Sequence, residues 1–151
     1  IKEIPSYCVL SLRKEIPNYY YEGELWKELS AFAKENKINI SDETFSIYHN
    51  EEYKEKDVDV ELCAIVNEIG KGAGNFKFRF TEPVSMMACT MVYGDFSNIS
   101  YAYRSFAKWL QENSQYKMKG SSRQIVHRGP WNEKNPKNYL TELQIPLENL
   151  L

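Results

Sequence analysis

The feature that most constrains the fold is an internal repeat. Two segments, Gly23–Lys37 and Ser97–Asn113, carry apolar residues at the spacing of an amphipathic helix. The two helical patterns align position by position: Trp26 with Tyr103, Leu29 with Phe106, Phe32 with Trp109, and Asn36 with Asn113. Each predicted helix follows a strand pattern and precedes two more. The sequence therefore predicts two copies of a strand–helix–strand–strand module.

The strands around the two helices align as well. Ile47–His49 corresponds to Ile125–His127, and Val60–Leu62 corresponds to Thr141–Leu143, with small loop insertions between them. Alternating or β-branched residues predict seven strands. These strands are Ile4–Ile16, Glu43–His49, Val58–Val66, Phe76–Phe80, Val84–Tyr93, Arg123–Arg128 and Tyr139–Leu147, with a charged turn at Asn50–Lys56.

Two such modules predict an α+β fold, in which a pseudo-twofold, curved antiparallel sheet carries two helices on one face. We expect one domain over residues 1–151, with repeats of about 1–69 and 76–151 and a glycine-rich connector at 70–74. A phosphate-binding loop at 70–74 is not favoured. The following segment, Phe76–Phe80, alternates like a strand and supplies no helix amino terminus for an anion.

Composition excludes several classes of protein. The 151 residues contain no apolar run of 18, so a membrane-spanning helix is not expected. A net charge of −2 does not favour direct contact with nucleic acid, and two isolated helices do not form a DNA-binding head. Three cysteines without paired spacing (Cys8, Cys63, Cys89) indicate reduced thiols in the cytoplasm. No metal or cofactor motif is present.

Glu142 is the candidate functional residue, because it is a carboxylate in the middle of an apolar strand. Along Tyr139–Leu147, Leu143 and its alternate neighbours share one side of the strand and Glu142 lies on the other. Glu61 occupies the matching position in the first repeat. We expect both glutamates on the sheet face away from the helices. There they are either solvated or form the floor of a ligand site.

Aromatic side chains are the candidate walls of such a site, since 14% of the residues are aromatic. We predict walls from Tyr48, Tyr93, Trp26, Trp109 or Trp131, although Trp26 and Trp109 also fit ordinary packing of the helices. Aromatic rings around a carboxylate suit a lipophilic cation, through apolar area and cation–π attraction.

Several motifs in the chain resemble one family. The carboxyl end carries Arg128–Glu133 (RGPWNE), Asn135-Pro136 and Tyr139–Leu147 (YLTELQIPL). In the same order as in the family, the chain also has Ile4-Pro5, Arg13, Gly23–Trp26, Asp57–Leu62, Tyr93–Phe96, Ala102-Tyr103 and Trp109-Leu110. Together these resemble the GyrI-like small-molecule-binding domains, the effector-binding domains that follow helix-turn-helix heads in AraC-type and MerR-type bacterial regulators.

The resemblance implies a ligand cleft at the junction of two modules, with the glutamate of the motif Thr-Glu-x-x-Ile-Pro, here Glu142, inside it. It implies a ligand sensor that is not an enzyme, with the DNA-binding domain elsewhere in a longer chain. Three alternatives stay open. They are a hydrolase of strained electrophiles such as cyclopropanoids, a gyrase-inhibitor-like protein-binding module, and a haem protein that uses His49 or His127.

Overall fold

The computed structural model describes residues 1–50, 56–130 and 132–150. Most of the predicted turn at Asn50–Lys56, and Trp131 of the carboxyl-terminal motif, lie outside the described residues. The chain divides into two compact units. The first unit is Pro5–Pro83, and the second unit is Val84–Leu151 together with Ile1–Ile4.

The first unit is a four-stranded antiparallel sheet with one helix. Its elements are β2 (Cys8–Ile16), the 3₁₀ turn η1 (Tyr19–Tyr21), α1 (Glu22–Glu35), β3 (Ile40–Tyr48), β4 (Val58–Val66) and β5 (Phe76–Phe80). The strand order is β3-β4-β2-β5. Before β5, Ala73 and Phe76 exchange both backbone hydrogen bonds and Gly74 has a φ of 59°. The glycines therefore permit a tight turn at this point.

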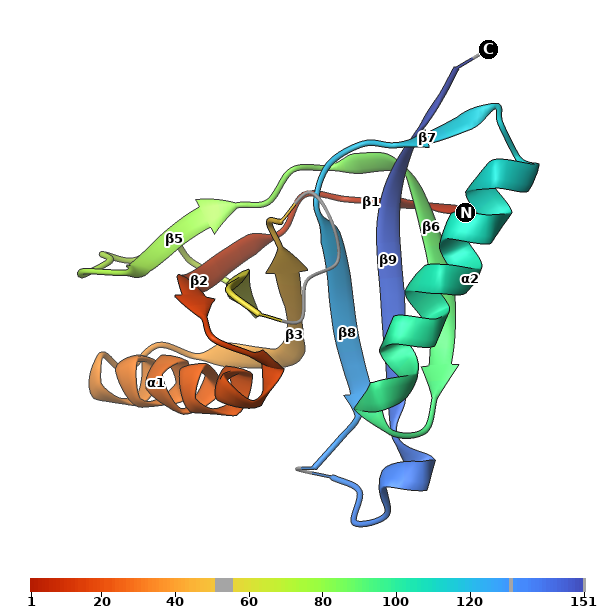
Figure 1. Ribbon diagram of the computed structural model, residues 1–151. Coiled ribbons are helices and arrows are strands. Elements are labelled where there is room, and N and C mark those ends of the chain that lie inside the picture. The colour runs from red at the N-terminus through yellow and green to blue at the C-terminus, as the bar shows by residue number, and fades with distance from the viewer. Residues whose placement is uncertain (51–55, 131, 151) are drawn as a thin grey trace. The chain divides into compact units, whose positions relative to one another are not determined.

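The second unit repeats this plan. Its elements are β1 (Lys2–Ile4), β6 (Val84–Tyr93), η2 (Phe96–Asn98), α2 (Ile99–Glu112), β7 (Tyr116–Met118), β8 (Ser122–Arg128), η3 (Pro136–Asn138) and β9 (Leu140–Asn149). The strand order is β1-β6-β9-β8, again antiparallel, and the short β7 pairs with the end of β9. The helix α2 runs alongside this sheet (Figure 1).

The two units confirm the predicted α+β fold of duplicated modules. The pairing β3-β4-β2 in the first unit matches β8-β9-β6 in the second. Both helices have 14 residues and follow a 3₁₀ turn. Each ends at an asparagine whose side-chain amide donates to the carbonyl four residues earlier, Asn36 to Phe32 at 2.9 Å and Asn113 to Trp109 at 2.8 Å.

One detail of the second helix differs from the prediction. The predicted helical segment starts at Ser97, but Ser97 lies inside η2, where its backbone N–H donates to the Asp95 carboxylate at 2.8 Å. The helix begins two residues later, at Ile99.

The edge strands are exchanged between the modules. β1 precedes β2 in the chain but pairs with β6, and β5 precedes β6 but pairs with β2. The sequence predicts one strand over Ile4–Ile16, but the structure interrupts it between Ile4 and Cys8. Pro5 lies at this break, where its missing N–H costs no strand hydrogen bond. Each sheet is thus completed by a strand that lies distant in sequence from the others.

Each helix covers one face of its own sheet. In the first unit, Leu25, Leu29 and Ala33 of α1 pack on alternate residues of β4, namely Val58, Val60, Leu62, Ala64 and Val66. In the second unit, Ile99, Ala102, Tyr103 and Phe106 pack on Val92, Leu143 and Ile145. Both glutamates therefore face away from the helix of their unit, as the alternation predicts. None of the helices in the described ranges has the length and apolar character needed to cross a membrane.

Candidate carboxylate sites

Glu61 lies in the middle of β4 with a side chain that is only 4% exposed. Arg79 of β5 donates two hydrogen bonds to its carboxylate, from Nε to Oε2 at 2.7 Å and from Nη2 to Oε1 at 2.7 Å. Nε2 of His49 lies 2.8 Å from Oε1, and the Ser11 hydroxyl donates as well. A guanidinium that engages both oxygens is the strongest partner a carboxylate finds in a protein.

These contacts determine the protonation state of Glu61. Burial by itself raises the pKa of this carboxyl, but the hydrogen bonds from His49 and Arg79 outweigh burial and lower it to about 2. The reciprocal contact raises the pKa of Arg79. Because Arg79 already neutralises the charge of Glu61, this carboxylate would attract a cationic ligand only weakly.

Glu142 occupies the equivalent position in β9 and is equally buried, with 4% of its side chain exposed. Nζ of Lys2 in β1 lies 3.1 Å from Oε2, and Nε2 of His127 lies 3.0 Å from Oε1. Nε2 of Gln144 donates to Oε2 at 2.6 Å. The cation in this cluster is a single ammonium, and the Lys2 side chain is 53% exposed.

The pKa of Glu142 is also lowered, because hydrogen bonds from Gln144, His127 and Lys2 together outweigh the effect of burial. Burial raises the pKa of the neighbouring Cys89 thiol, which also contacts Glu142. The thiol is therefore protonated at neutral pH and is a weak nucleophile.

The residues across the strands differ between the two clusters. Glu61 is paired in register with Arg13 on one side, and Arg13 forms a two-bonded ion pair with Asp59 at 2.9 and 2.7 Å. Glu142 is paired in register with Met91 of β6 and Ile125 of β8. On its other side Glu61 is paired with Ile47 of β3. The two positions therefore differ on one side only, where Glu61 faces Arg13 and Glu142 faces Met91.

A third carboxylate, Glu22 at the start of α1, was not among the residues predicted from the sequence. Oη of Tyr48 donates to its Oε1 at 2.5 Å, and the side chains of Ser46 and Trp26 donate to it as well. The ring of Tyr19 packs edge-on to that of Tyr48, 5.7 Å between centroids. Burial raises the pKa of Glu22, and these hydrogen bonds only partly offset the effect.

The sequence did contain a signal for Glu22. It lies four residues before Trp26, so both side chains lie on the same face of a helix. The prediction started the helix at Gly23 and so left Glu22 outside it.

The predicted aromatic residues separate into three places. Tyr48 and Trp26 pack with the core on the α1 side of the first unit, on the face opposite Glu61, and meet around Glu22. Tyr93, 67% exposed, pairs with Leu140 and so shares the face of Glu142. Trp109 of α2 stacks between Phe106 and Tyr116, at centroid distances of 5.8 and 5.5 Å. Ligand contact by these four residues stays a prediction.

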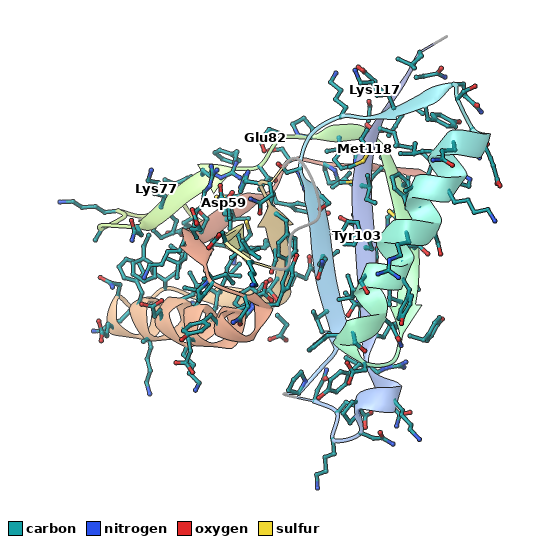
Figure 2. The ribbon with its side chains drawn as sticks, viewed as in Figure 1. Asp59, Lys77, Glu82, Tyr103, Lys117 and Met118 are labelled. Atoms are coloured by element: carbon teal, nitrogen blue, oxygen red, sulfur yellow. The ribbon has the colours of Figure 1, made fainter. Side chains whose placement is uncertain are left out.

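The second unit has a neutral polar cluster on its helix side. Oη of Tyr103, labelled in Figure 2, lies 2.9 Å from Oγ of Ser122 and accepts from Gln124 at 3.5 Å. Burial raises the pKa of this tyrosine. Tyr103 corresponds to Trp26 in the helix alignment, so the two helix-side clusters are equivalent in position but differ in charge.

The histidines considered for haem both face carboxylates. His49 contacts Glu61 and His127 contacts Glu142 through Nε2, so iron ligation through that atom would break the contact. Within residues 1–50, 56–130 and 132–150, no three His, Cys, Asp or Glu side chains gather closely enough to hold a metal ion.

The duplicated α+β module thus carries a buried carboxylate at the same position of each copy, with a histidine and a cation beside it. The family model of the GyrI-like small molecule binding domain matches residues 1–148, so the chain belongs to this family. A search of curated proteins gave no match.

Among solved structures, the chain is similar to the carboxyl-terminal domain of EcmrR, a MerR-family regulator. The two share 30% identity with a TM-score of 0.89, over 98% of this chain and 95% of the other. In the EcmrR–DNA complex the identity is 29% and the TM-score again 0.89, over 98% of this chain but only 56% of the EcmrR chain.

Two more distant structures show the same fold. One is a hydrolase from Listeria innocua, with 11% identity and a TM-score of 0.67, over 97% of this chain and 89% of the other. The other is SAV2435 bound to tetraphenylphosphonium, with 8% identity and a TM-score of 0.61, over 99% of this chain and 93% of the other.

Proposed function

We propose that this chain is the ligand-sensing, effector-binding domain of a bacterial transcription regulator, and that it binds a lipophilic cation at Glu142. The observation that carries the proposal is the state of Glu142. It is a buried carboxylate whose positive partner is the ammonium of a half-exposed lysine. Membership of a small-molecule-binding family and the 30% identity to a regulator's domain support the proposal.

In the absence of a ligand, the Lys2 ammonium occupies the position next to Glu142 that the cation of a ligand would take. Its ammonium lies 3.1 Å from Oε2 of Glu142, and its strand β1 has only three residues with an irregular register on β6. An ion pair with one exposed partner contributes about 1 kcal/mol or less. A ligand that brings both a cation and apolar area against Met91 and Ile125 can therefore replace Lys2 at small cost.

Displacement of Lys2 would also provide the signal. The ammonium links β1 to β9, so its release frees β1 from one of its few attachments. A ligand shifts a conformational equilibrium only through a difference in affinity for the two states. Here the difference arises because Glu142 accepts the ligand's cation fully only when Lys2 has left.

Turnover is not favoured by the same geometry. His127 and Glu142 could orient a water molecule, but the only thiol in the cluster, Cys89, has a raised pKa. Incubation with a cyclopropane-bearing electrophile, followed by mass spectrometry, is expected to return the compound unchanged. A hydrolysed product that disappears in Glu142→Gln would contradict the sensor proposal and favour the hydrolase.

The direct experiment is calorimetric titration with tetraphenylphosphonium, a lipophilic cation. The parent protein is expected to bind it saturably, and Glu142→Gln to bind it at least about tenfold more weakly, a loss of about 1.4 kcal/mol. Glu148→Gln is a matched control near the end of the same strand, where the carboxylate contacts only Lys119 among the described residues, at 4.0 Å. If Glu142→Gln binds as tightly as the parent, Glu142 is not the cation site.

A further inference from the structure

The internal repeat allows each buried residue to be compared with its counterpart. α1 and α2 have the same length and follow equivalent 3₁₀ turns, so the first residue of α1, Glu22, corresponds to the first residue of α2, Ile99. Ile99 is 8% exposed and packs in the core of the second unit with Val92, Leu143 and Ile145. The fold can therefore fill this position with an apolar side chain.

At the same position the first unit places a carboxylate, although burying one is costly. Its donors are all neutral: the Tyr48 hydroxyl at 2.5 Å, the Ser46 hydroxyl and the Trp26 indole. In the described part of the chain no Lys, Arg or His lies within ion-pair distance of Glu22. The two buried glutamates, Glu61 and Glu142, each have a cation and a histidine by contrast. Glu22 is thus a half-buried carboxylate without a cationic partner among the described residues.

The surroundings of Glu22 are those of a site for organic cations. Two aromatic side chains, Tyr48 and Trp26, touch the carboxylate, and a third, Tyr19, packs against Tyr48. Ring faces attract cations, and the effect is strongest where water is excluded. Glu22, Trp26 and Tyr19 each keep part of their surface exposed, so this cluster lies at the edge of the core of the first unit.

We propose that Glu22, Tyr48 and Trp26 form a second subsite in the first unit, which takes the cationic group of an aromatic or lipophilic ligand. Because a cationic ligand neutralises the charge that burial makes unfavourable, binding there stabilises the ionised form of Glu22. The raised pKa of Glu22 is consistent with this missing compensation. The inference rests on the proposed function for the ligand class, but it assigns a different carboxylate in a different unit.

The experiment compares three variants in calorimetric titrations with tetraphenylphosphonium. Glu22→Gln is expected to lower the affinity at least about tenfold, or to remove one of two binding events. Glu24→Gln is the matched control, since Glu24 lies on the same helix but is exposed and pairs only with Lys27 at 3.3 Å among the described residues. Its titration curve is expected to match that of the parent.

A second readout locates the ligand. The change in tryptophan fluorescence on adding tetraphenylphosphonium is expected to shrink or vanish in Trp26→Phe and to persist in Trp109→Phe, whose ring stacks in the second unit. A fluorescence change that is intact in Trp26→Phe and lost in Trp109→Phe would place the ligand elsewhere and overturn the inference.

The two proposals fail in different ways. If the parent does not bind tetraphenylphosphonium, the proposed ligand class is wrong. If the parent binds and Glu142→Gln weakens binding while Glu22→Gln does not, the second subsite is overturned and the proposed function stands. A Glu22→Gln protein with a lower Tm and unchanged affinity would identify Glu22 as a structural carboxylate, which also overturns the inference.

Discussion

Glu61 and Glu142 occupy the same place in two copies of one module and have acquired different surroundings. Each lies mid-strand, buried, with a histidine at Oε1 and a cation from an exchanged edge strand. Around Glu61 the cation is a guanidinium with two short hydrogen bonds, and the cross-strand neighbour is Arg13. Around Glu142 the cation is a half-exposed ammonium, and the neighbour is Met91.

The difference suggests that the two copies of the module use the same buried carboxylate for different purposes, stability in one copy and ligand binding in the other. A carboxylate held by arginine is compensated permanently, so it ties β5 to β4 and stabilises the first unit. A carboxylate held by lysine is compensated weakly and stays open to exchange, because an ammonium binds as a single point charge. In the proposed function, the same backbone therefore supports a structural ion pair in one unit and an exchangeable one in the other.

The largest expected effect is the difference in stability lost when Arg79 or Lys2 is replaced. Arg79→Met leaves Glu61 buried without its counter-ion and is expected to lower the free energy of unfolding by about 3 kcal/mol. Lys2→Met is expected to lower it by less than about 1 kcal/mol, because the lysine is half exposed. Urea denaturation at neutral pH measures both, and equal losses would remove the distinction between the two units.

Loss of the Glu142 charge is expected to affect binding more than stability. Glu142→Gln removes about 1.4 kcal/mol or more of binding free energy for tetraphenylphosphonium, but keeps the side-chain shape and the contact with Gln144. Triphenylphosphine oxide, an uncharged aromatic compound, is the control ligand. Its affinity is expected to be the same in parent and variant, and a parallel loss would indicate a damaged site rather than a lost charge.

Stability at low pH gives a test specific to Glu61. Its pKa of about 2 in the folded state lies below the ordinary value of 4.5, so its contribution to stability is complete above pH 4.5. That contribution is lost as the pH falls from 4.5 through 2, because the unfolded chain binds the proton first. Urea midpoints across this range are expected to fall less steeply in Glu61→Gln than in the parent; identical slopes would mean that other carboxyls dominate.

The smallest expected effect is a change in ligand affinity when Lys2 is replaced, and it tests specifically whether the ligand displaces Lys2 from Glu142. Lys2→Met is expected to raise the affinity for tetraphenylphosphonium about threefold, because the ligand no longer competes with an ammonium worth less than about 1 kcal/mol. Lys2→Arg, which can form two hydrogen bonds, is expected to lower it. Calorimetry on both variants tests the idea, and affinities that change in the same direction would argue against displacement of Lys2.

Residue spacing accounted for most of the fold. The helix stripes predicted the duplicated module, and the alternation in β4 and β9 predicted the face on which each glutamate lies. The sequence missed β7 and merged β1 with β2. A three-residue strand is too short for its periodicity to be recognised, and the break at Pro5 falls within a continuous apolar pattern.

The two carboxylate clusters were predicted only in part, and ligand binding at either of them stays a prediction. Glu142 and Glu61 were identified because a carboxylate in an apolar strand is visible in the sequence alone. Their partners Lys2 and Arg79 were not, because both come from edge strands exchanged between the modules. Glu22 was missed for a different reason, since a glutamate in the first helical turn resembles an ordinary solvated residue that favours the helix dipole.

What the sequence by itself determined is local: which residues form each helix and strand, and which side of the strand each side chain occupies. These follow from the 3.6-residue and two-residue periods of the backbone. Only the tertiary structure decided which charges meet. Strand pairing brought an arginine to Glu61 and a lysine to Glu142, whereas no cation pairs with Glu22 in the part of the chain that the structure describes. The free energy of burying a carboxylate depends on these partners. The repeating pattern of residues within one strand or helix does not reveal which partners other elements will bring.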